Sequence, residues 1–386
     1  MEKPELMSPV GNWTMLKAAI DGGADAIYFG IKGFNMREAA KNFTIKDLLK
    51  IGRIKKIKKY LCLNTVVYDN EIEKIKKVLD KAKSNVDAII CWDLAIVNEA
   101  LKRGFEVHLS TQASVSNSKA AKFYKKIGVK RINLARELTL KQVKEVSKIM
   151  DTEVFVHGAM CVSLSGRCFI SQDMFGESAN RGECLQPCRR EYLIKDVETG
   201  DELALGRKYV MSPKDLCTLP FLNKIIKSGV KALKIEGRNR SPEYVKIVTS
   251  VYREAIDNPK GDVNKLIKKL ETVYNRGFSN GFYLGLPNVE DWSDVYGSAA
   301  TKRKLEIGRV TKYYPKIKVV AVEILTKDLK VDDEILIIGD ETGVVEEKVR
   351  EMEINHKKIE KVKKGQEVAI KINKKVRKGD MVYKWV

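Results

Sequence analysis

One segment of the chain, from Glu153 to Tyr192, limits what this sequence can fold into. It reads EVFVHGAMCVSLSGRCFISQDMFGESANRGECLQPCRREY. It holds four of the seven cysteines, with gaps of six, fifteen and three residues between them: Cys161, Cys168, Cys184 and Cys188. Glycines and polar residues lie between the cysteines, and most of the segment has no sustained helical or strand period. A loop of this length inside a compact domain is usually functional, and something other than a hydrophobic core must hold it together.

The spacing of the cysteines favours one kind of metal centre over another. Thiolates that converge from one loop can bind zinc or an iron–sulfur cluster. Structural zinc sites prefer pairs with two residues between the ligands, so gaps of six and three suit a [4Fe-4S] cluster better. The alternative is that the cysteines are small buried hydrophobic residues. This is less favoured, because all four lie in one polar, Gly-rich loop. Cys217, in SPKDLC, is a fifth candidate, but it is expected to begin a helix and to serve packing.

The composition places the chain among soluble globular proteins. Its 386 residues, 44% of them hydrophobic, suffice for one large domain and a small one. No run of eighteen apolar residues occurs, and the N-terminus lacks the apolar region of a signal peptide, so we expect a cytoplasmic protein without a membrane span. Clustered cysteines in that reducing compartment bind metal or do chemistry more often than they form disulfides.

The net charge of +21 favours a polyanionic partner, because Lys and Arg displace counterions condensed on phosphates. Nucleic acid is therefore the expected partner. The alternative is a Lys-rich surface that only keeps the protein solvated. The sequence gives no indication of oligomeric state.

Short β-branched runs alternate with amphipathic helices over residues 1–260, which predicts a (β/α)8 TIM-like barrel. An open, doubly wound sheet is the alternative, but no Gly-rich phosphate loop follows the first strand. The second helix is expected over Ile45–Lys58. The eight expected strands are Glu5–Val10, Ala26–Gly30, Tyr60–Thr65, Ala88–Trp92, Glu106–Ser110, Arg131–Ala135, Glu153–His157 and Ala232–Gly237.

The four-cysteine segment lies in an insertion, residues 158–230, that follows the seventh strand. It should cover the C-terminal face of the barrel, where barrel enzymes place their active sites. Residues 261–300 are expected to form a helical linker segment. From residue 301 to 386 the chain changes to short alternating strands with Gly and Asp turns and a Lys-rich surface, which predicts a small C-terminal all-β barrel domain.

Polar residues at the ends of the predicted strands are candidates for ligand binding, because strand C-termini meet at the barrel mouth. Arg136 and Arg238 can clamp a carboxylate or phosphate, unless they pair with neighbouring glutamates such as Glu137 and Glu236. His157 is the one histidine well placed for chemistry, and a packed histidine beside the cysteines is the alternative. No protease triad or zinc-protease helix is visible by spacing. The candidates for substrate binding are Asn64, Gln112, Asn133, Arg136 and Arg238.

Several stretches together resemble one known family. EVFVHGAMCVSLSGRC, GECLQPCRREY, MSPKDLC and LKIEGRNRSPEY resemble the collagenase-like peptidases of family U32, and STQAS and INLARELTL are similar to it as well. The C-terminal strands look like the small barrel of that family, which is similar to domain two of translation elongation factors. The family name implies a peptidase, whereas some relatives are oxygen-independent hydroxylases of a tRNA uridine, a ribosomal-RNA cytidine or a ubiquinone precursor.

The resemblance implies a specific set of site residues. The hydroxylases carry a [4Fe-4S] cluster on four cysteines, which match Cys161, Cys168, Cys184 and Cys188 by position. The RNA-modifying relatives depend on prephenate, so Arg136 or Arg238 would hold such a dicarboxylate, and His157 or Glu236 would donate or accept a proton. The expected function is hydroxylation of a tRNA or rRNA pyrimidine with a prephenate-like donor. The alternatives are a collagenase-like peptidase and a non-catalytic RNA-binding protein.

Overall fold

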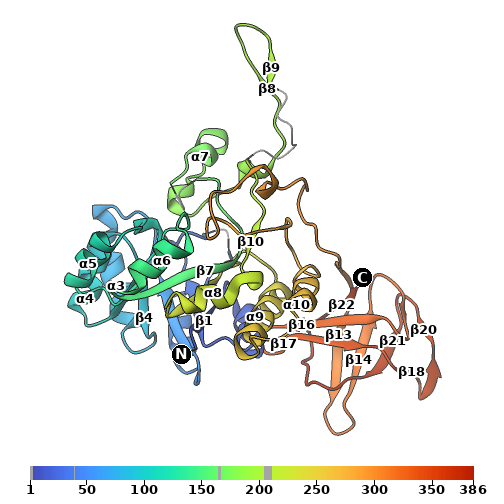
Figure 1. Cartoon of the computed structure of the whole chain (residues 1–386). Coiled ribbons are helices and arrows are strands. Elements are labelled where there is room, and N and C mark those ends of the chain that lie inside the picture. The colour runs from blue at the N-terminus through green and yellow to red at the C-terminus, as the bar shows by residue number, and fades with distance from the viewer. Residues whose placement is uncertain (1–2, 39, 164–166, 204–210) are drawn as a thin grey trace.

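The computed structural model describes residues 3–38, 40–163, 167–203 and 211–386. Eight parallel strands form a closed barrel in which each pairs with the next and the eighth pairs with both the seventh and the first (Figure 1). The predicted (β/α)8 barrel is therefore confirmed, and the open-sheet alternative is wrong. The strands are β1 (Glu5–Val10), β2 (Ala26–Gly30), β3 (Lys58–Cys62), β4 (Ala88–Cys91), β5 (Glu106–Leu109), β6 (Arg131–Asn133), β7 (Asp151–Gly158) and β11 (Ala232–Ile235).

Helices connect successive strands and cover the outside of the barrel. Four of them begin where the sequence offers a side-chain cap: the side chains of Asn12, Asp93, Asn117 and Thr139 accept hydrogen bonds from the first turns of their helices. The second helix is much shorter than predicted, because the backbone turns at Lys56 with a positive φ and then enters β3. The helices are α1 (Trp13–Asp21), α2 (Asp47–Gly52), α3 (Ile72–Ala82), α4 (Leu94–Lys102), α5 (Ser118–Lys126), α6 (Leu140–Ser147), α8 (Leu222–Lys227) and α9 (Pro242–Asp257).

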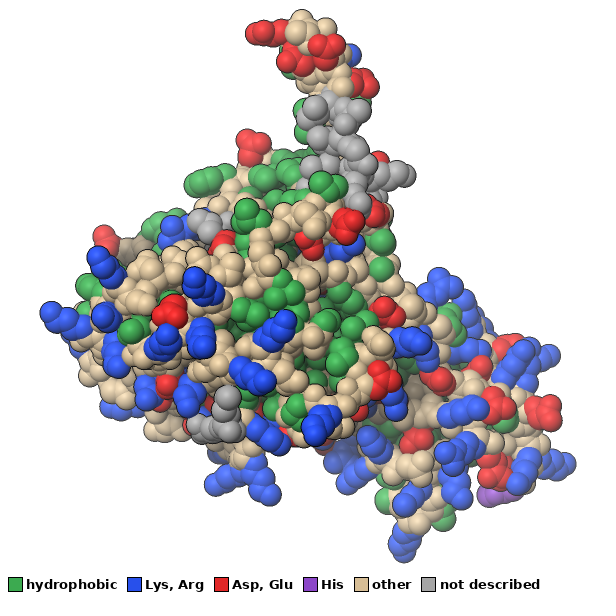
Figure 2. All heavy atoms as spheres, viewed as in Figure 1, with side chains coloured by type: hydrophobic (Ala, Val, Ile, Leu, Met, Phe, Trp, Pro, Cys, Tyr) green, Lys and Arg blue, Asp and Glu red, His purple; other side chains and the backbone are tan. Residues whose placement is uncertain are grey.

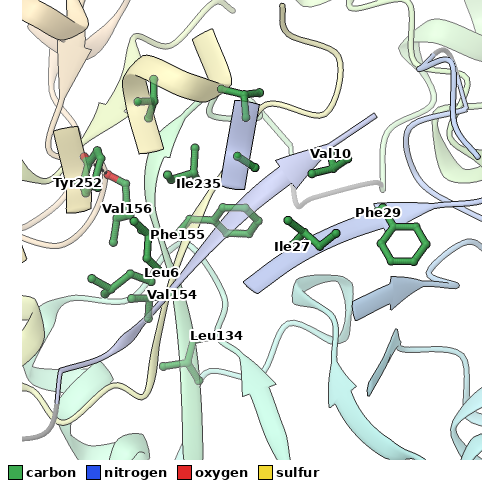
Figure 3. Close-up of a cluster of buried hydrophobic side chains, with 14 of the residues drawn as sticks. Leu6, Val10, Ile27, Phe29, Leu134, Val154, Phe155, Val156, Ile235 and Tyr252 are labelled. Atoms are coloured by element: carbon green, nitrogen blue, oxygen red, sulfur yellow. Dashed lines mark hydrogen bonds between the residues drawn. The ribbon is translucent and has the colours of Figure 1, made fainter. Parts of the chain in front are cut away.

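The alternation of side chains along each strand divides the core into two layers. Outward side chains such as Leu6, Val154 and Ile235 pack under the helices (Figure 3). Inward side chains form a separate cluster inside the barrel that includes Tyr28 and Tyr60. Two buried ion pairs also lie in the barrel interior, one between Lys234 and Glu153 and one between Arg131 and Glu5. Each buried charge therefore has an oppositely charged partner.

The insertion between β7 and β11 carries several short elements. A two-stranded hairpin, β8 (Ile194–Lys195) with β9 (Glu202–Leu203), projects from the body of the molecule (Figure 1). Strand β10 (Asp215–Cys217) pairs antiparallel with β7, so Cys217 ends a strand and the prediction that it begins a helix is wrong. The remaining elements are α7 (Ile170–Phe175) and the 3-10 turns η3 (Ala179–Arg181), η4 (Pro187–Arg189) and η5 (Leu219–Phe221).

After α9, the chain forms α10 (Val263–Leu270) and β12 (Phe278–Ser279) and then enters the C-terminal domain. The all-β expectation is confirmed: an eight-stranded antiparallel sheet in the order β17-β16-β22-β13-β14-β21-β18-β19 surrounds its own apolar core. Its strands are β13 (Lys304–Tyr314), β14 (Val319–Ile324), β16 (Glu334–Gly339), β17 (Gly343–Lys348), β18 (Met352–Ile354), β19 (Lys357–Ile359), β21 (Glu367–Lys371) and β22 (Met381–Trp385), and β15 (Leu329–Lys330) pairs with β20 (Lys361–Val362) beside them.

The C-terminal domain packs against the barrel through α1 and α9. Thr14 donates a hydrogen bond to Asp340, and Lys246 pairs with Glu346 at 2.8 Å. Leu336 and Val344 of the sheet join the apolar core of the barrel. Among the described residues, no helix combines the length and the apolar character needed to cross a membrane.

Candidate active site

A cavity of about 140 Å³ lies at the C-terminal face of the barrel. By the volume that one water needs, it has room for on the order of ten waters. Its floor and walls come from residues at the ends of barrel strands and the loops that follow them, and its roof comes from the insertion after β7. The lining includes Tyr28, Arg37, Cys62, Asn64, Gln112, Asn133, Arg136, Lys234, Glu236, Arg238, Cys161, Cys168, Cys184, Cys188 and Arg189.

All four cysteines of the insertion line this one cavity. None forms a disulfide, and burial raises the pKa of the Cys188 thiol although Arg189 opposes that effect. Four thiol groups facing one space are the donor set of a [4Fe-4S] cluster. Within the described residues, no three ligand side chains lie close enough together to hold a single metal ion, and residues 164–166 between Cys161 and Cys168 are outside that set. The residue types and their shared cavity fit such a cluster, and the present positions of the sulfur atoms do not close one.

Glu236 and Arg37 form the ion pair of the cavity. The Nε and Nη2 groups of Arg37 donate hydrogen bonds to Oε1 of Glu236 at 3.1 and 2.9 Å. Burial alone would raise the pKa of Glu236, but the guanidinium groups of Arg37, Arg136 and Arg238 outweigh it and hold the pKa below its usual value. Glu236 is therefore a carboxylate at neutral pH, able to accept a proton or a hydrogen bond.

Three further arginines line the cavity with donor groups left over. Arg136 donates to the Ala159 carbonyl at 2.8 Å and lies over the Phe155 ring. Arg238 donates to Asn35 at 2.6 Å and to Asn42. The Nε groups of Arg136, Arg189 and Arg238 are buried without a hydrogen-bond partner among the described residues. Burial lowers the pKa of Arg189 to about 10, with the nearby Arg276 contributing, so its charge is weakly compensated. Unpaired buried donors of this kind are binding groups for an anion.

In the described part of the chain, Arg136 and Arg238 do not form ion pairs with the glutamates next to them in sequence. Glu236 pairs with Arg37, and the hydrogen bonds that Arg136 and Arg238 make in the described structure go to carbonyl and amide oxygens.

Three amide side chains complete the wall. The Asn64 amide donates to Ser110 at 3.2 Å and accepts from the Met36 backbone at 3.2 Å, so its orientation is fixed. Gln112 accepts a hydrogen bond from the Ser110 hydroxyl. The Oδ1 atom of Asn133 is buried with no partner among the described residues. A ligand with a hydrogen-bond donor would satisfy that atom.

His157 does not line the cavity. Its ring lies among the rings of Tyr244, Tyr252 and Phe278, at centroid distances of 6.0, 5.5 and 5.7 Å. Burial lowers the pKa of His157 to about 4, which Asp215 offsets only in part, so the imidazole is neutral at pH 7. The cause is a bulge in β7: Phe155 pairs with Lys234 but His157 pairs with Ile235, so one extra residue turns the histidine to the outer face. The structure thus favours the packed alternative for this residue.

The other sequence candidates fall outside or beneath the site. His108 is buried within the barrel and contacts Glu106. Cys217 is buried against Tyr252 and does not line the cavity, and Cys91 lies in the core. Cys62 is buried in β3 and also forms part of the cavity floor.

The sequence reasoning missed Arg37 and Tyr28. Arg37 follows β2 in the stretch FNMREAAKNF, where polar residues after a strand end were the available signal. Tyr28 lies mid-strand, and its hydroxyl donates to the Ile235 carbonyl at 2.6 Å, which no local pattern could indicate.

Comparison with known proteins places this site in a family. The model of peptidase family U32 matches residues 11–293. An uncharacterized protease of Methanocaldococcus jannaschii is 46% identical, over 98% of this chain and 97% of that protein. A collagenase of Porphyromonas gingivalis is 43% identical, over 99% of this chain and 97% of that protein. The tRNA hydroxylation protein P1 of Bacillus subtilis is 35% identical, over 83% of this chain and 80% of that protein. The resemblance stated from the motifs is confirmed, and the chain belongs to peptidase family U32.

Proposed function

We propose that this protein is an iron–sulfur enzyme that hydroxylates a pyrimidine of tRNA or rRNA and uses a prephenate-like dicarboxylate as co-substrate. The observation that carries the proposal is the composition of one cavity: four cysteines, three arginines with unpaired buried N–H groups, and an ionised carboxylate. A relative named as a tRNA hydroxylation protein supports the choice of RNA. The net charge of +21 supports it independently.

Each group of the cavity has a role in this proposal. Cys161, Cys168, Cys184 and Cys188 would hold a [4Fe-4S] cluster, which supplies one-electron chemistry when bound. Arg136 and Arg238 bind the carboxylates of the co-substrate through their free Nε–H groups. Glu236 accepts a proton from the substrate, because its carboxyl is ionised and faces the same space. Asn64, Gln112 and Asn133 hydrogen-bond the edge of the base, as amides do in nucleobase pockets.

Access to the cavity requires a base that has left its stack, so the substrate nucleotide lies in a single-stranded loop. The C-terminal domain would hold the phosphates of the same RNA. Its exposed lysines include Lys357, Lys363, Lys364, Lys374 and Lys375, and Figure 2 shows Lys and Arg side chains spread over this domain. Affinity for RNA should then fall steeply as salt concentration rises.

Peptidase activity is the second candidate, because two relatives are named as a protease and a collagenase. Among the described residues that line the cavity, none is a histidine, and His157 faces away from it. A serine or cysteine nucleophile in the cavity would therefore lack the base that such proteases use.

Two measurements test the proposal. Anaerobically purified protein should contain about four iron and four sulfide per chain. Cys184→Ala should lose both, while the matched variant Cys217→Ala, which removes a cysteine outside the cavity, should keep both. Mass spectrometry of RNA nucleosides from cells lacking the gene should show loss of a hydroxylated pyrimidine, restored by the wild type but not by Cys184→Ala. An unchanged nucleoside profile, together with cleavage of denatured collagen by iron-free protein, would establish the peptidase instead.

A further inference from the structure

A second hollow lies beside the cavity on the same face of the barrel. This groove, of about 410 Å³, shares Met36 and Gln112 with the cavity, so the two spaces are contiguous. Its walls are the loops that follow β3 and β4 on one side and the α7–η3 part of the insertion on the other. The groove is lined by Val66, Tyr68, Trp92, Phe169, Gln172 and Asn180, with Arg167 and Arg181.

Three aromatic rings line the groove, and those of Tyr68 and Phe169 are open to solvent. Tyr68 is 56% exposed and Phe169 is 71% exposed, although both are large apolar side chains. Figure 2 shows hydrophobic side chains gathered on the surface over α7, below the projecting hairpin. The indole of Trp92 is held in place, because its Nε1–H donates to the Asn64 carbonyl at 3.0 Å. Exposed aromatic surface in a groove marks a binding site more often than a solvated face.

Each of two arginines lies over one of these rings. The Arg181 guanidinium is 4.9 Å from the centre of the Tyr68 ring, and it donates two hydrogen bonds to the Glu71 carboxylate oxygens, at 2.9 and 2.6 Å, which fix its plane. The Arg167 guanidinium is 5.6 Å from the centre of the Trp92 ring and donates to the Gln112 carbonyl at 3.2 Å. Aromatic rings and guanidinium planes offer stacking surfaces to any nucleobase.

We propose that this groove stacks the nucleobase adjacent to the one that enters the cavity, as a second subsite for single-stranded RNA. The inference rests on the proposed function. Met36 and Gln112 lie where the two hollows meet, so a strand whose reactive base occupies the cavity continues directly into the groove. Gln172 and Asn180 present amide groups to the edges of the stacked base. This subsite adds affinity without strict sequence preference, since every base has a π-face.

The groove fits an RNA strand better than a peptide. Extended peptides commonly bind by adding a strand to an unpaired sheet edge. The strands beneath the groove, β3, β4 and β5, are each paired on both sides in the closed barrel, so they offer no such edge. The positive net charge also matches a phosphate backbone.

Fluorescence anisotropy with a labelled single-stranded RNA of about eight nucleotides tests the subsite in the full-length, iron-loaded protein. Tyr68→Ala and Phe169→Ala should each weaken binding about tenfold or more, whereas Tyr68→Phe, which keeps the ring, should bind like the wild type. Phe123→Ala removes a ring of equal exposure to Tyr68 on the far-removed helix α5 and serves as the control. Iron content is measured for Phe169→Ala, because Phe169 adjoins Cys168.

Removing one base from the RNA separates stacking from a general loss of affinity. An abasic nucleotide next to the reactive one should weaken wild-type binding by a similar factor, and Tyr68→Ala should then add little further loss. Unchanged affinity in Tyr68→Ala and Phe169→Ala, with RNA still bound and still hydroxylated, would overturn the subsite and leave the proposed function intact. Absence of any RNA binding by the iron-loaded wild type, with an unaltered cellular nucleoside profile, would overturn both.

Discussion

The ion pair between Arg37 and Glu236 provides a prediction whose size depends on pH. Arg37 donates two hydrogen bonds to Glu236, whose side chain is 12% exposed. Removing one partner of a fully buried pair costs about 3–5 kcal/mol. The Arg37 side chain is 35% exposed, so solvent screens part of the interaction, and Arg136 and Arg238 remain nearby. We therefore expect Arg37→Gln to lower the free energy of unfolding by about 2 kcal/mol at pH 7.

The sign of the pH dependence follows from the pKa of Glu236. In the wild type, burial raises this pKa, but Arg37 and the other arginines outweigh burial and lower it. The resulting stabilisation is present above the unfolded-state pKa of about 4.3 and is lost as pH falls through the folded-state pKa. In Arg37→Gln, fewer positive charges oppose the effect of burial, so the pKa of Glu236 rises. Protonation of Glu236 near pH 4 then removes the unpaired buried charge. The cost of the substitution should fall below about 1 kcal/mol there.

Urea denaturation at pH 7 and near pH 4 measures this difference. A Trp385→Phe background leaves Trp13, Trp92 and Trp292 to report on the barrel by fluorescence. Glu236→Gln and the double variant Arg37→Gln/Glu236→Gln complete a mutant cycle, and the double variant should show no pH-dependent cost. If Arg37→Gln costs the same at both pH values, or if the two substitutions add at pH 7, the pair does not set the charge of Glu236 and the reasoning fails.

Two further predictions address other buried groups. Glu153→Gln should destabilise the barrel by about 3–5 kcal/mol, because it leaves the Lys234 ammonium, which lies 2.8 Å from the carboxylate, without its charged partner. In denaturation experiments, the double variant Glu153→Leu/Lys234→Met should recover most of the lost stability. A double variant as unstable as the single one would contradict this. His157→Phe should leave the hydroxylated nucleoside intact. It should also reduce the loss of folding stability between about pH 6.5 and pH 4. In the wild type, folding lowers the pKa of His157, so the stability present at a pH above the unfolded-state pKa is lost as pH falls toward the folded-state pKa. Loss of the nucleoside with iron content unchanged would instead give His157 a chemical role.

The barrel could be predicted from the sequence because its signals are local. Eight β-branched runs with one helix after each leave few topologies, and the closed barrel confirms that count. The shared location of the cysteines and the strand-end polar residues could be predicted in the same way, since the C-terminal ends of parallel strands meet at one face. Asn64, Gln112, Asn133, Arg136, Glu236 and Arg238 all line the cavity for this reason.

What the sequence could not indicate depends on contacts between distant residues. The bulge that turns His157 outward arises from the pairing of β7 with β11, about eighty residues later, so the local sequence of β7 could not indicate which side of the strand the ring takes. The partner of Glu236 is Arg37, which is 199 residues away, whereas sequence reasoning looked to adjacent glutamates and arginines. The groove beside the cavity likewise combines Tyr68 and Trp92 of the barrel loops with Phe169 of the insertion.

The distribution of charge along the barrel axis explains why the cavity should attract anions. Inside the barrel, positive and negative groups are paired: Arg131 with Glu5, and Lys234 with Glu153. At the mouth, Glu236 pairs with Arg37, whereas Arg136, Arg189 and Arg238 contact neutral oxygens and keep N–H groups that have no partner among the described residues. Along the barrel axis, the uncompensated positive charge therefore lies at the mouth, where low-dielectric walls concentrate its potential. A carboxylate or a phosphate would relieve this uncompensated charge, and the proposed co-substrate and the proposed RNA strand both carry such groups.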